Sequence, residues 1–342
     1  MFFARLVCCD NKGMLRDEII DFLGEDWVAL NGYIKDSLFS DIPLLQEVNE
    51  DILVHSGKML RPIVALLVAR MISGTTAPDD SIRVAAATEM LHNATLLHDD
   101  VADESPTRRG EPTLFSKIGP SGAVLVGDFW LARAMELTIS YSKRDSLAKI
   151  FSKAMTNLAE GEMLQLQNAS GNGTNKEDYF RIIYCKTASL FETACLSVSV
   201  SCNATPEQQE AVKEYAVSLG IAFQIKDDML DCWSDLDTFG KVCGADIIDR
   251  KKTFLYITAL ESATQTQRQE LLSLYENTTL DKDEKIQKVR AIYEQLSVAQ
   301  KAQKAVEEYN SKAFEALEQI EVAPQRKATL IEVAKKLIDR NK

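Results

Sequence analysis

The sequence predicts an all-α protein in the form of a single large helical bundle. Three features of the 342-residue chain favour this fold class. Glycine (15 residues) and proline (8 residues) are sparse, whereas an all-β chain needs both for many tight turns. Residues 81–100 and 211–228 are apolar nearly all round a helix, which is typical of buried helices. Nothing alternates at a period of two for long enough to indicate a sheet.

The helices are expected to form one domain, residues 14–342, after a frayed N-terminal extension at residues 1–13. No linker in the sequence is long enough to divide domains. Breaks between helices are expected where Gly, Pro, Asn and Asp gather, at residues 73–81, 168–178, 203–208 and 276–284.

Capping signals precede both buried helices. Asp80 or Ser81 is the candidate N-cap of the first, and Thr205, followed by Pro206, is the candidate N-cap of the second. Residues 283–320 place apolar side chains at three- and four-residue steps between charged ones, which predicts an amphipathic surface helix or a pair of them.

The net charge and the cysteine content limit which functions and which cellular location the sequence favours. The net charge is −12, so the chain is a poor nucleic-acid binder, because phosphate contacts need a basic face. The seven cysteines are odd in number and form no Cys-x-x-Cys pair, which favours reduced thiols and a cytoplasmic location. The sequence contains no run of about 18 apolar residues, so no transmembrane helix is predicted.

The first buried helix ends in an acidic motif, LLHDDVADESPTRRG at residues 96–110. Asp99 and Asp103 are four residues apart and share a helix face, with Asp100 about 100° round the axis. Pro106 then stops the helix. Carboxylates that converge at a buried helix end repel one another unless positive charge joins them. The alternative is a solvated acidic helix end, or carboxylates paired with the two arginines of the motif.

A second motif of the same form, FQIKDDMLD at residues 223–231, ends the other buried helix. Its carboxylates are Asp227, Asp228 and Asp231. Opposed across a cavity, the two motifs would gather far more negative charge than an interior tolerates alone. That charge suits Mg²⁺, which takes one or two carboxylates per ion and keeps its other positions for water and phosphate oxygens. The pair of motifs therefore predicts a metal-bridged diphosphate clamp.

Basic residues support the clamp. Arg108 and Arg109 can each fork onto phosphate oxygens. Lys58 and Arg61 are three residues apart on one face, just inside a predicted helix start, and helix N-termini favour anions. Two further lysines, in the segments KT and DRKKTF, are Lys186 and Lys251. A solvated surface role is the usual alternative for any one lysine, and the grouping with the aspartates argues against it here.

No other catalytic constellation competes. The chain has three histidines, and no Ser-His-Asp, HExxH, GxxxxGK[ST] or GxGxxG pattern occurs. His92 lies about two helical turns before Asp99 on the same face. It is either a satisfied core group or a hydrogen-bond donor to a phosphate.

These residues resemble the trans-isoprenyl diphosphate synthases, or polyprenyl synthetases, of the long-chain octaprenyl, hexaprenyl or solanesyl type. The matching segments run from about residue 50 to 255: GKMLRP, EMLHNATLLHDDVADESPTRRGEPT, VLVGDFWLARA, EGEMLQL, KTASLFETA, FQIKDDMLD and GKVCGADIIDRKKTF. Two departures are Ser56, where the family often has a second Gly, and Arg250-Lys251, where it often has Gly-Lys. Neither removes a charge that the chemistry needs.

The resemblance implies the isoprenoid synthase fold, an all-α bundle around a deep apolar cavity, and a homodimer. It also implies head-to-tail condensation of an allylic diphosphate with isopentenyl diphosphate. The implied cofactor is Mg²⁺, with about three ions when substrate is bound. A peripheral membrane contact for product release is a further expectation.

The resemblance also implies a role for each site residue, carried over by position. The expected metal ligands are Asp99, Asp103 and Asp227. The supporting carboxylates are Asp100, Asp228 and Asp231. The residues expected to meet the allylic diphosphate are Arg108, Lys186, Thr187, Gln224, Lys241 and Lys251. Those expected to hold isopentenyl diphosphate are Gly57, Lys58, Arg61, His92 and Arg109.

The expected product is a long-chain all-trans polyprenyl diphosphate, of the kind used for quinone side chains. Thr95 and Ala94, four and five residues before Asp99, lie about one turn deeper along the helix. Bulky aromatic residues near here plug the cavity in short-chain members of the family, whereas both residues are small in this chain. The first motif also lacks the two-residue insertion of many bacterial short-chain enzymes.

Three alternatives stay open. A short-chain farnesyl or geranylgeranyl diphosphate synthase would result if deeper residues set the floor of the cavity. A terpene cyclase shares the fold and the first motif, but its second motif usually has Asn and Ser or Thr, and it needs no isopentenyl site. A non-catalytic regulatory subunit of the same fold typically loses aspartates that this chain keeps.

Overall fold

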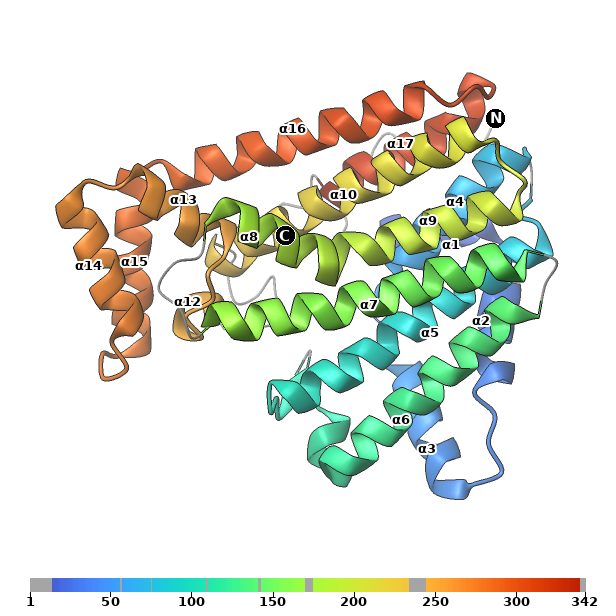
Figure 1. Ribbon diagram of the computed structural model, residues 1–342, viewed down its shortest axis with the longest axis horizontal. Coiled ribbons are helices and arrows are strands. Elements are labelled where there is room, and N and C mark those ends of the chain that lie inside the picture. The colour runs from blue at the N-terminus through green and yellow to red at the C-terminus, as the bar shows by residue number, and fades with distance from the viewer. Residues whose placement is uncertain are drawn as a thin grey trace.

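The computed structural model describes residues 14–55, 57–74, 76–108, 110–140, 143–169, 175–233 and 244–338. In these ranges the chain is a bundle whose long helices run mostly along its longest axis (Figure 1). The elements, in chain order, are α1 Met14–Leu23, α2 Glu25–Ser37, α3 Pro43–Val54, α4 Leu60–Ser73, α5 Asp79–Ala102, β1 Thr107–Arg108, β2 Glu111–Pro112, α6 Leu114–Ile139, α7 Arg144–Ala169, α8 Lys176–Ile183, η1 Tyr184–Ala188, α9 Ser189–Ser201, α10 Pro206–Trp233, α12 Ala245–Ile248, α13 Phe254–Ser262, α14 Gln265–Glu276, α15 Lys282–Gln295, α16 Val298–Glu318 and α17 Pro324–Ile338.

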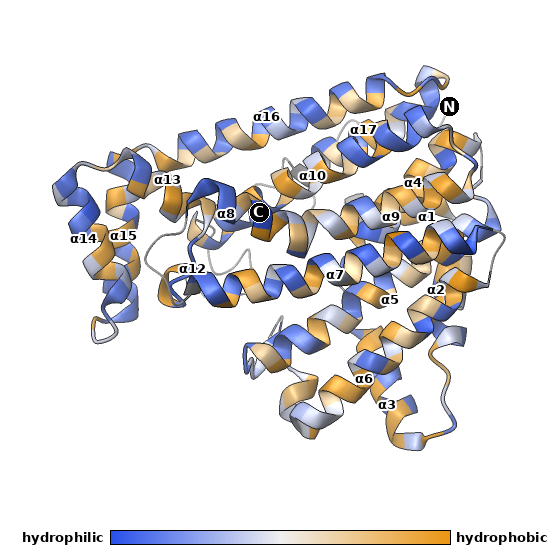
Figure 2. Cartoon of the chain, in the orientation of Figure 1, coloured by the Kyte–Doolittle hydropathy of each residue, from blue (hydrophilic) through white to orange (hydrophobic). Residues whose placement is uncertain are grey.

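The centre of the bundle is α9, which packs against α4, α5, α7 and α10. The predicted all-α fold is confirmed, and the two apolar segments expected at 81–100 and 211–228 lie within α5 and α10. Both helices bury residues around most of their circumference, as their sequence requires. The amphipathic stretch at 283–320 forms two helices, α15 and α16. Along both, hydrophobic and hydrophilic residues alternate in patches (Figure 2).

One of the two predicted helix caps is confirmed and the other is wrong. The Thr205 hydroxyl accepts the Gln208 N–H at 3.2 Å, and the Thr205 N–H donates to the Gln208 amide oxygen at 3.0 Å. Neither Asp80 nor Ser81 caps α5, because Pro78 already occupies the cap position and the helix begins at Asp79, at least two residues earlier than expected. Asp79 and Asp80 instead place negative charge in the first turn, where the helix dipole favours it.

Strands β1 and β2 form a short antiparallel pair between α5 and α6. They were not expected from the sequence, because each is only two residues long. Arg108 pairs with Glu111, and Gly110 turns the chain at a φ of 85°, a value that glycine adopts without strain. Arg108 contacts Asp100 in the last turn of α5.

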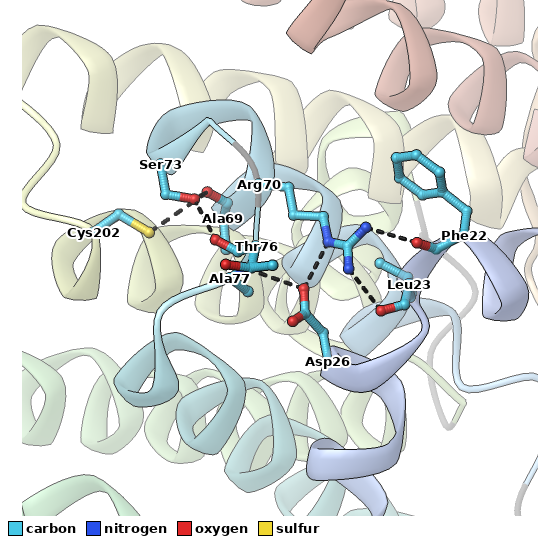
Figure 3. A network of polar contacts seen from close by, with 9 residues as sticks. All are labelled: Phe22, Leu23, Asp26, Ala69, Arg70, Ser73, Thr76, Ala77 and Cys202. Atoms are coloured by element: carbon cyan, nitrogen blue, oxygen red, sulfur yellow. Dashed lines mark hydrogen bonds and ion pairs between the residues drawn. The ribbon is translucent and has the colours of Figure 1, made fainter.

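The first helices are fixed to the bundle by an ion pair, drawn in Figure 3. Arg70 of α4 donates to a carboxylate oxygen of Asp26 at 2.6 Å, and its other two nitrogens donate to the backbone oxygens of Phe22 and Leu23. The same Asp26 oxygen accepts the Ala77 N–H at 3.0 Å. Asp26 is only 4% exposed, so this pair holds α1 and α2 against the α4–α5 connection.

The cysteines within the described residues, Cys185, Cys195, Cys202 and Cys232, are free thiols. Cys8, Cys9 and Cys243 lie outside those residues. Across the described part of the chain, every helix is too short or too polar to cross a membrane.

Candidate active site

Both acidic motifs lie at the same end of the bundle. Helices α5, α7 and α10 each have their C-terminal end toward the left of Figure 1, and α10 packs against α12. Asp99 and Asp100 are in the last turn of α5, and Asp227 and Asp228 are in the last two turns of α10. The parallel course of these helices therefore brings together residues that are far apart in the sequence.

The π-helical turn η1 connects α7 to the second acidic motif through two neighbouring residues. Lys186 donates to Glu162, and to the Gln165 amide oxygen at 3.0 Å; both partners are on α7. The next residue, Thr187, donates to the Gln224 amide oxygen on α10 at 2.8 Å. Single π-helical turns widen a helix and often occur at functional sites. Here the turn aims one side chain toward each side of the site.

Asp99 of the first motif is a largely buried carboxylate that two other carboxylates repel. Burial raises the pKa of Asp99 to about 6, the positive charges of Lys186 and Arg108 oppose the shift, and the negative charges of Glu162 and Asp103 add to it. Asp103 caps the end of α5 and is exposed. A cation placed between these carboxylates would relieve that repulsion.

The middle aspartate of the first motif is held by the protein. Arg108 contacts one oxygen of the buried Asp100 through Nε and Nη2, both at 2.8 Å. The sequence left open whether the aspartates pair with the arginines of the motif. In the structure, Asp100 pairs with Arg108. Arg108 therefore orients the end of α5 in this structure.

The middle aspartate of the second motif is held in the same way. The carboxylate of Asp228 accepts hydrogen bonds from the Tyr179 hydroxyl at 2.8 Å, the Phe254 N–H at 3.1 Å and the Gln224 amide at 3.1 Å. Burial, followed by the charge of Asp246, raises the pKa of Asp228 to about 7. Burial also raises the pKa of Tyr179 well above its ordinary value, so the phenol stays a donor.

The third aspartate of the second motif fixes α12. One carboxylate oxygen of Asp231 accepts the Asp246 N–H at 3.0 Å, and the Asp231 carbonyl accepts the Gly244 N–H at 2.7 Å. Lys251 donates to Asp246 at 2.9 Å. Burial is the largest single influence on the pKa of Lys251 and lowers it. The charges of Asp246, Asp249 and Asp231, with the hydrogen bond to Asp246, together outweigh burial, so the pKa is raised. Lys251 therefore lies near carboxylates, as the sequence predicted.

The residues expected to hold isopentenyl diphosphate lie around the start of α4. Nη1 of Arg61 is 3.0 Å from Nε2 of His92. Because a guanidinium only donates, Nε2 is the acceptor and the proton of a neutral His92 is on Nδ1. Lys58 is exposed and precedes α4, which begins at Leu60, so its expected position inside the helix is wrong. Met59, at a φ of 50°, turns the chain immediately before the helix.

The expected chain-length residues differ in burial, and Thr95 is only partly buried. Ala94 is completely buried, and the Thr95 hydroxyl donates to the His92 carbonyl at 2.8 Å. A cavity of about 190 Å³ lies near another face of α5, where its lining includes Met59, Glu89 and Trp130. It does not include either expected chain-length residue.

The carboxylates of the site fit Mg²⁺ as ligands. Among the described residues, no three His, Cys, Asp or Glu side chains converge closely enough to hold a metal by themselves. Mg²⁺ does not require this, because it commonly takes one or two carboxylates and completes its shell with water and substrate phosphate. The repelling carboxylates at Asp99 and Asp103 fit that mode of binding.

Two expected residues, Arg109 and Lys241, lie outside the described residues, as does Ser56. Gly57 is half-buried just before Lys58. Four further residues that contact the site were not predicted from the sequence: Glu162, Gln165, Tyr179 and Asp246. The segment EGEMLQL already contained the first two, but only the packing of α7 on η1 brings them to Lys186.

Comparisons with known proteins point to one family. The family model of the polyprenyl synthetases matches residues 42–296. The chain is 35% identical over 325 residues to an all-trans-nonaprenyl-diphosphate synthase (geranyl-diphosphate specific) of Rhodobacter capsulatus, covering 95% of this chain and 98% of that protein. It is 37% identical over 253 residues to the octaprenyl diphosphate synthase of Escherichia coli, covering 74% and 77%. The crystal structure of a decaprenyl diphosphate synthase from Rhodobacter capsulatus superposes with a TM-score of 0.87 at 32% identity, covering 96% and 99%.

Proposed function

The chain belongs to the polyprenyl synthetase family, and we propose that residues 14–342 form one prenyltransferase domain. It condenses an allylic diphosphate repeatedly with isopentenyl diphosphate to give a long-chain all-trans polyprenyl diphosphate. The similarity to nonaprenyl, octaprenyl and decaprenyl diphosphate synthases supports repeated elongation.

The observation that carries this proposal is the pair of neighbours Lys186 and Thr187. The positive charge of Lys186 acts on Asp99 of the first motif and lowers its pKa, and Thr187 donates to Gln224, which bonds Asp228 of the second. A diphosphate beside η1 would therefore meet a lysine and carboxylates from both motifs. A structural acidic surface would not need to collect these groups around one turn.

We assign Mg²⁺ to Asp99, Asp103 and Asp227, with Asp100, Asp228 and Asp231 positioning the ends of α5, α10 and α12. Mg²⁺ bound there would neutralise the leaving diphosphate and so favour cleavage of the allylic C–O bond. The protein's own cationic side chains also help to neutralise the leaving diphosphate. Lys186 is fixed by Glu162 and Gln165 beside Asp99, so its charge is already in place before substrate arrives.

The second substrate is assigned to the start of α4. Arg61 presents a fixed guanidinium there, and Lys58 and Gly57 lie in the preceding segment. Holding the isopentenyl double bond near the allylic carbon makes the attack effectively unimolecular. The departing diphosphate accepts the proton that is lost, so the reaction needs no dedicated side-chain base.

The reactive carbocation must be kept from water. Helices α5 and α10 both pack on α9, and apolar residues on the three helices, such as Ala94, Leu190 and Ile225, are almost completely buried, which supports a dry, apolar surrounding. A chain that grows along α5 would pass Ala94 first. The small size of this residue supports a long product.

Purified protein incubated with Mg²⁺, farnesyl diphosphate and labelled isopentenyl diphosphate tests the function. A ladder of linear prenyl diphosphates that ends in long chains is expected. A product that stops at geranylgeranyl length would establish a short-chain synthase, and a cyclic hydrocarbon a terpene cyclase. An absence of turnover under these conditions would favour a non-catalytic subunit.

The apolar surface of α6 and α7 supports a homodimer as the active form. Large apolar side chains remain exposed on both helices: Leu125 is 68% exposed and Met163 is 66% exposed. Leu166 lies one turn from Met163 and is also exposed. Monomeric proteins rarely leave a large contiguous apolar patch uncovered. Light scattering should give twice the monomer mass, and Met163→Glu should reduce it.

A peripheral membrane contact for product release is the last part of the proposal. Phe39, Ile42 and Leu44, around the connection between α2 and α3, expose large apolar side chains. Such side chains can enter the interface of a bilayer. Sedimentation with neutral phosphatidylcholine vesicles should retain the wild type and lose Phe39→Ser. Equal sedimentation of the wild type and Phe39→Ser would contradict this membrane contact.

A further inference from the structure

We propose that Phe191 is a positioning residue: its ring fixes the Arg61 guanidinium in the orientation that receives isopentenyl diphosphate. The inference rests on the proposed function and adds to it. It assigns to a buried aromatic residue on α9 an influence on one substrate only. Phe191 itself would not touch the diphosphate.

The contact is a cation–π interaction in a buried setting. The Arg61 guanidinium carbon lies 5.0 Å from the centroid of the Phe191 ring. Phe191 is 0% exposed, so the ring face is not shared with water. A cation within about 6 Å of a ring centroid is attracted by the negative charge of the ring face, most strongly when water is excluded.

The ring has little freedom to move away. Phe223 of α10 packs against it, with ring centroids 5.6 Å apart and an interplanar angle of 52°. Gly220, one turn earlier on α10, allows this close approach: a Cβ atom there would lie 3.3 Å from Phe191 Cδ2 and 2.6 Å from the Ala188 Cα. The platform formed by Phe191 and Phe223 is therefore set by the packing of α10 on α9.

Arg61 is held from two directions. The ring of Phe191 fixes the plane of the guanidinium, and His92 accepts from Nη1 at 3.0 Å. An arginine with a fixed plane loses less side-chain entropy when it forks onto a diphosphate. Without the ring, binding would have to order the side chain, and the affinity for isopentenyl diphosphate would fall.

The platform also links the two substrate sites. Phe223 precedes Gln224, which bonds both Thr187 and Asp228. A shift of α10 at the second motif would therefore move the surface on which Arg61 rests. The allylic site, by contrast, has its own fixed cation in Lys186, which does not touch Phe191 in the described contacts.

The test compares Phe191→Leu with Phe151→Leu. Phe151 on α7 is also completely buried, so the same substitution causes a similar packing loss away from Arg61. Isopentenyl diphosphate binding is measured by calorimetry, and KM for each substrate and kcat are measured well below each variant's Tm. Phe191→Tyr, which keeps the ring face, serves as the conservative rescue.

Phe191→Leu is expected to weaken isopentenyl diphosphate binding and to raise its KM by about three- to thirtyfold, with the allylic KM unchanged. Phe151→Leu should leave both KM values at their wild-type level, and Phe191→Tyr should restore the isopentenyl KM. An unchanged isopentenyl affinity in Phe191→Leu, or an equal rise of both KM values, would overturn the inference. If the wild type binds isopentenyl diphosphate but forms no product, the proposed function fails, and the binding comparison still decides the role of Phe191.

Discussion

Tyr179 donates a 2.8 Å hydrogen bond to Asp228, the middle aspartate of the second acidic motif. The middle aspartate of the first motif, Asp100, is bound in turn by Arg108 at 2.8 Å. In both motifs the middle carboxylate is buried and anchored by protein donors. In each motif, the middle aspartate therefore fixes the helix end, and the neighbouring aspartates are carried by that fixed end.

Tyr179→Phe should reduce activity by loosening the end of α10 beside Asp227. It removes one donor to a buried carboxylate, which costs about 1–3 kcal/mol of unfolding free energy. Denaturant titration and steady-state kinetics are the measurements. Tyr33→Phe is the matched control, because Tyr33 also bonds an aspartate, Asp79, but at an exposed position distant in the fold. Equal activity in the two variants would show that Asp228 needs no anchor.

Ala94→Phe should shorten the product. Ala94 is completely buried one turn below Asp99, so an aromatic ring there would fill space along the expected path of the chain. Overpacking is expected to cost about 1–3 kcal/mol, so the assay should be run well below the Tm. Chromatography of the products gives the chain length. The control is Ala291→Phe on the exposed side of α15. If Ala94→Phe makes products of wild-type length, the path along α5 is incorrectly assigned.

Asp26→Ala should destabilise the fold without altering catalysis. It leaves the largely buried Arg70 without its carboxylate, and breaking such a buried pair costs about 3–5 kcal/mol. Thermal unfolding measures the loss, and kcat below the Tm should match the wild type. Glu284→Ala breaks the exposed Lys288–Glu284 pair of α15 and should cost no more than about 0.5 kcal/mol. Equal effects of the two substitutions would mean that the Asp26 pair does not hold α1 and α2 in place.

Glu192→Gln should change the pH dependence of stability. Burial raises the pKa of Glu192, which accepts the Tyr184 hydroxyl at 2.9 Å. A carboxyl whose folded pKa is raised contributes stability below its unfolded pKa and loses it as the pH rises through the folded value. Glutamine cannot ionise, so the Tm of the variant relative to the wild type should rise as the pH increases above the ordinary glutamate pKa of about 4.5. A difference that is constant across this range would contradict the shift.

The sequence predicted the long helices well because their patterns are local. The apolar runs in α5 and α10 and the amphipathic run in α15 and α16 each indicate a helix without knowledge of the fold. The spacing of Asp99 and Asp103 likewise placed both on one face of a helix. Lys58 was misplaced because the left-handed turn at Met59, which delays the start of α4, leaves no clear signal in the sequence.

The anchors of the site could not be predicted in the same way. Tyr179, Glu162 and Asp246 reach the motifs only through the packing of α8, α7 and α12. No spacing in the sequence relates Tyr179 to Asp228. The partnership of Asp100 with Arg108 was foreseen only as an alternative, because eight residues and a turn separate them.

The central claim is that one Mg²⁺-diphosphate ligand contacts both acidic motifs. Its most direct test is calorimetric binding of farnesyl thiolodiphosphate, an unreactive allylic analogue, with Mg²⁺ present. The wild type is compared with Asp99→Asn, Asp227→Asn and the control Asp145→Asn, whose carboxylate is 95% exposed at the start of α7. Each motif variant should bind at least about tenfold more weakly, while the control should bind like the wild type. Wild-type affinity in Asp227→Asn would contradict it.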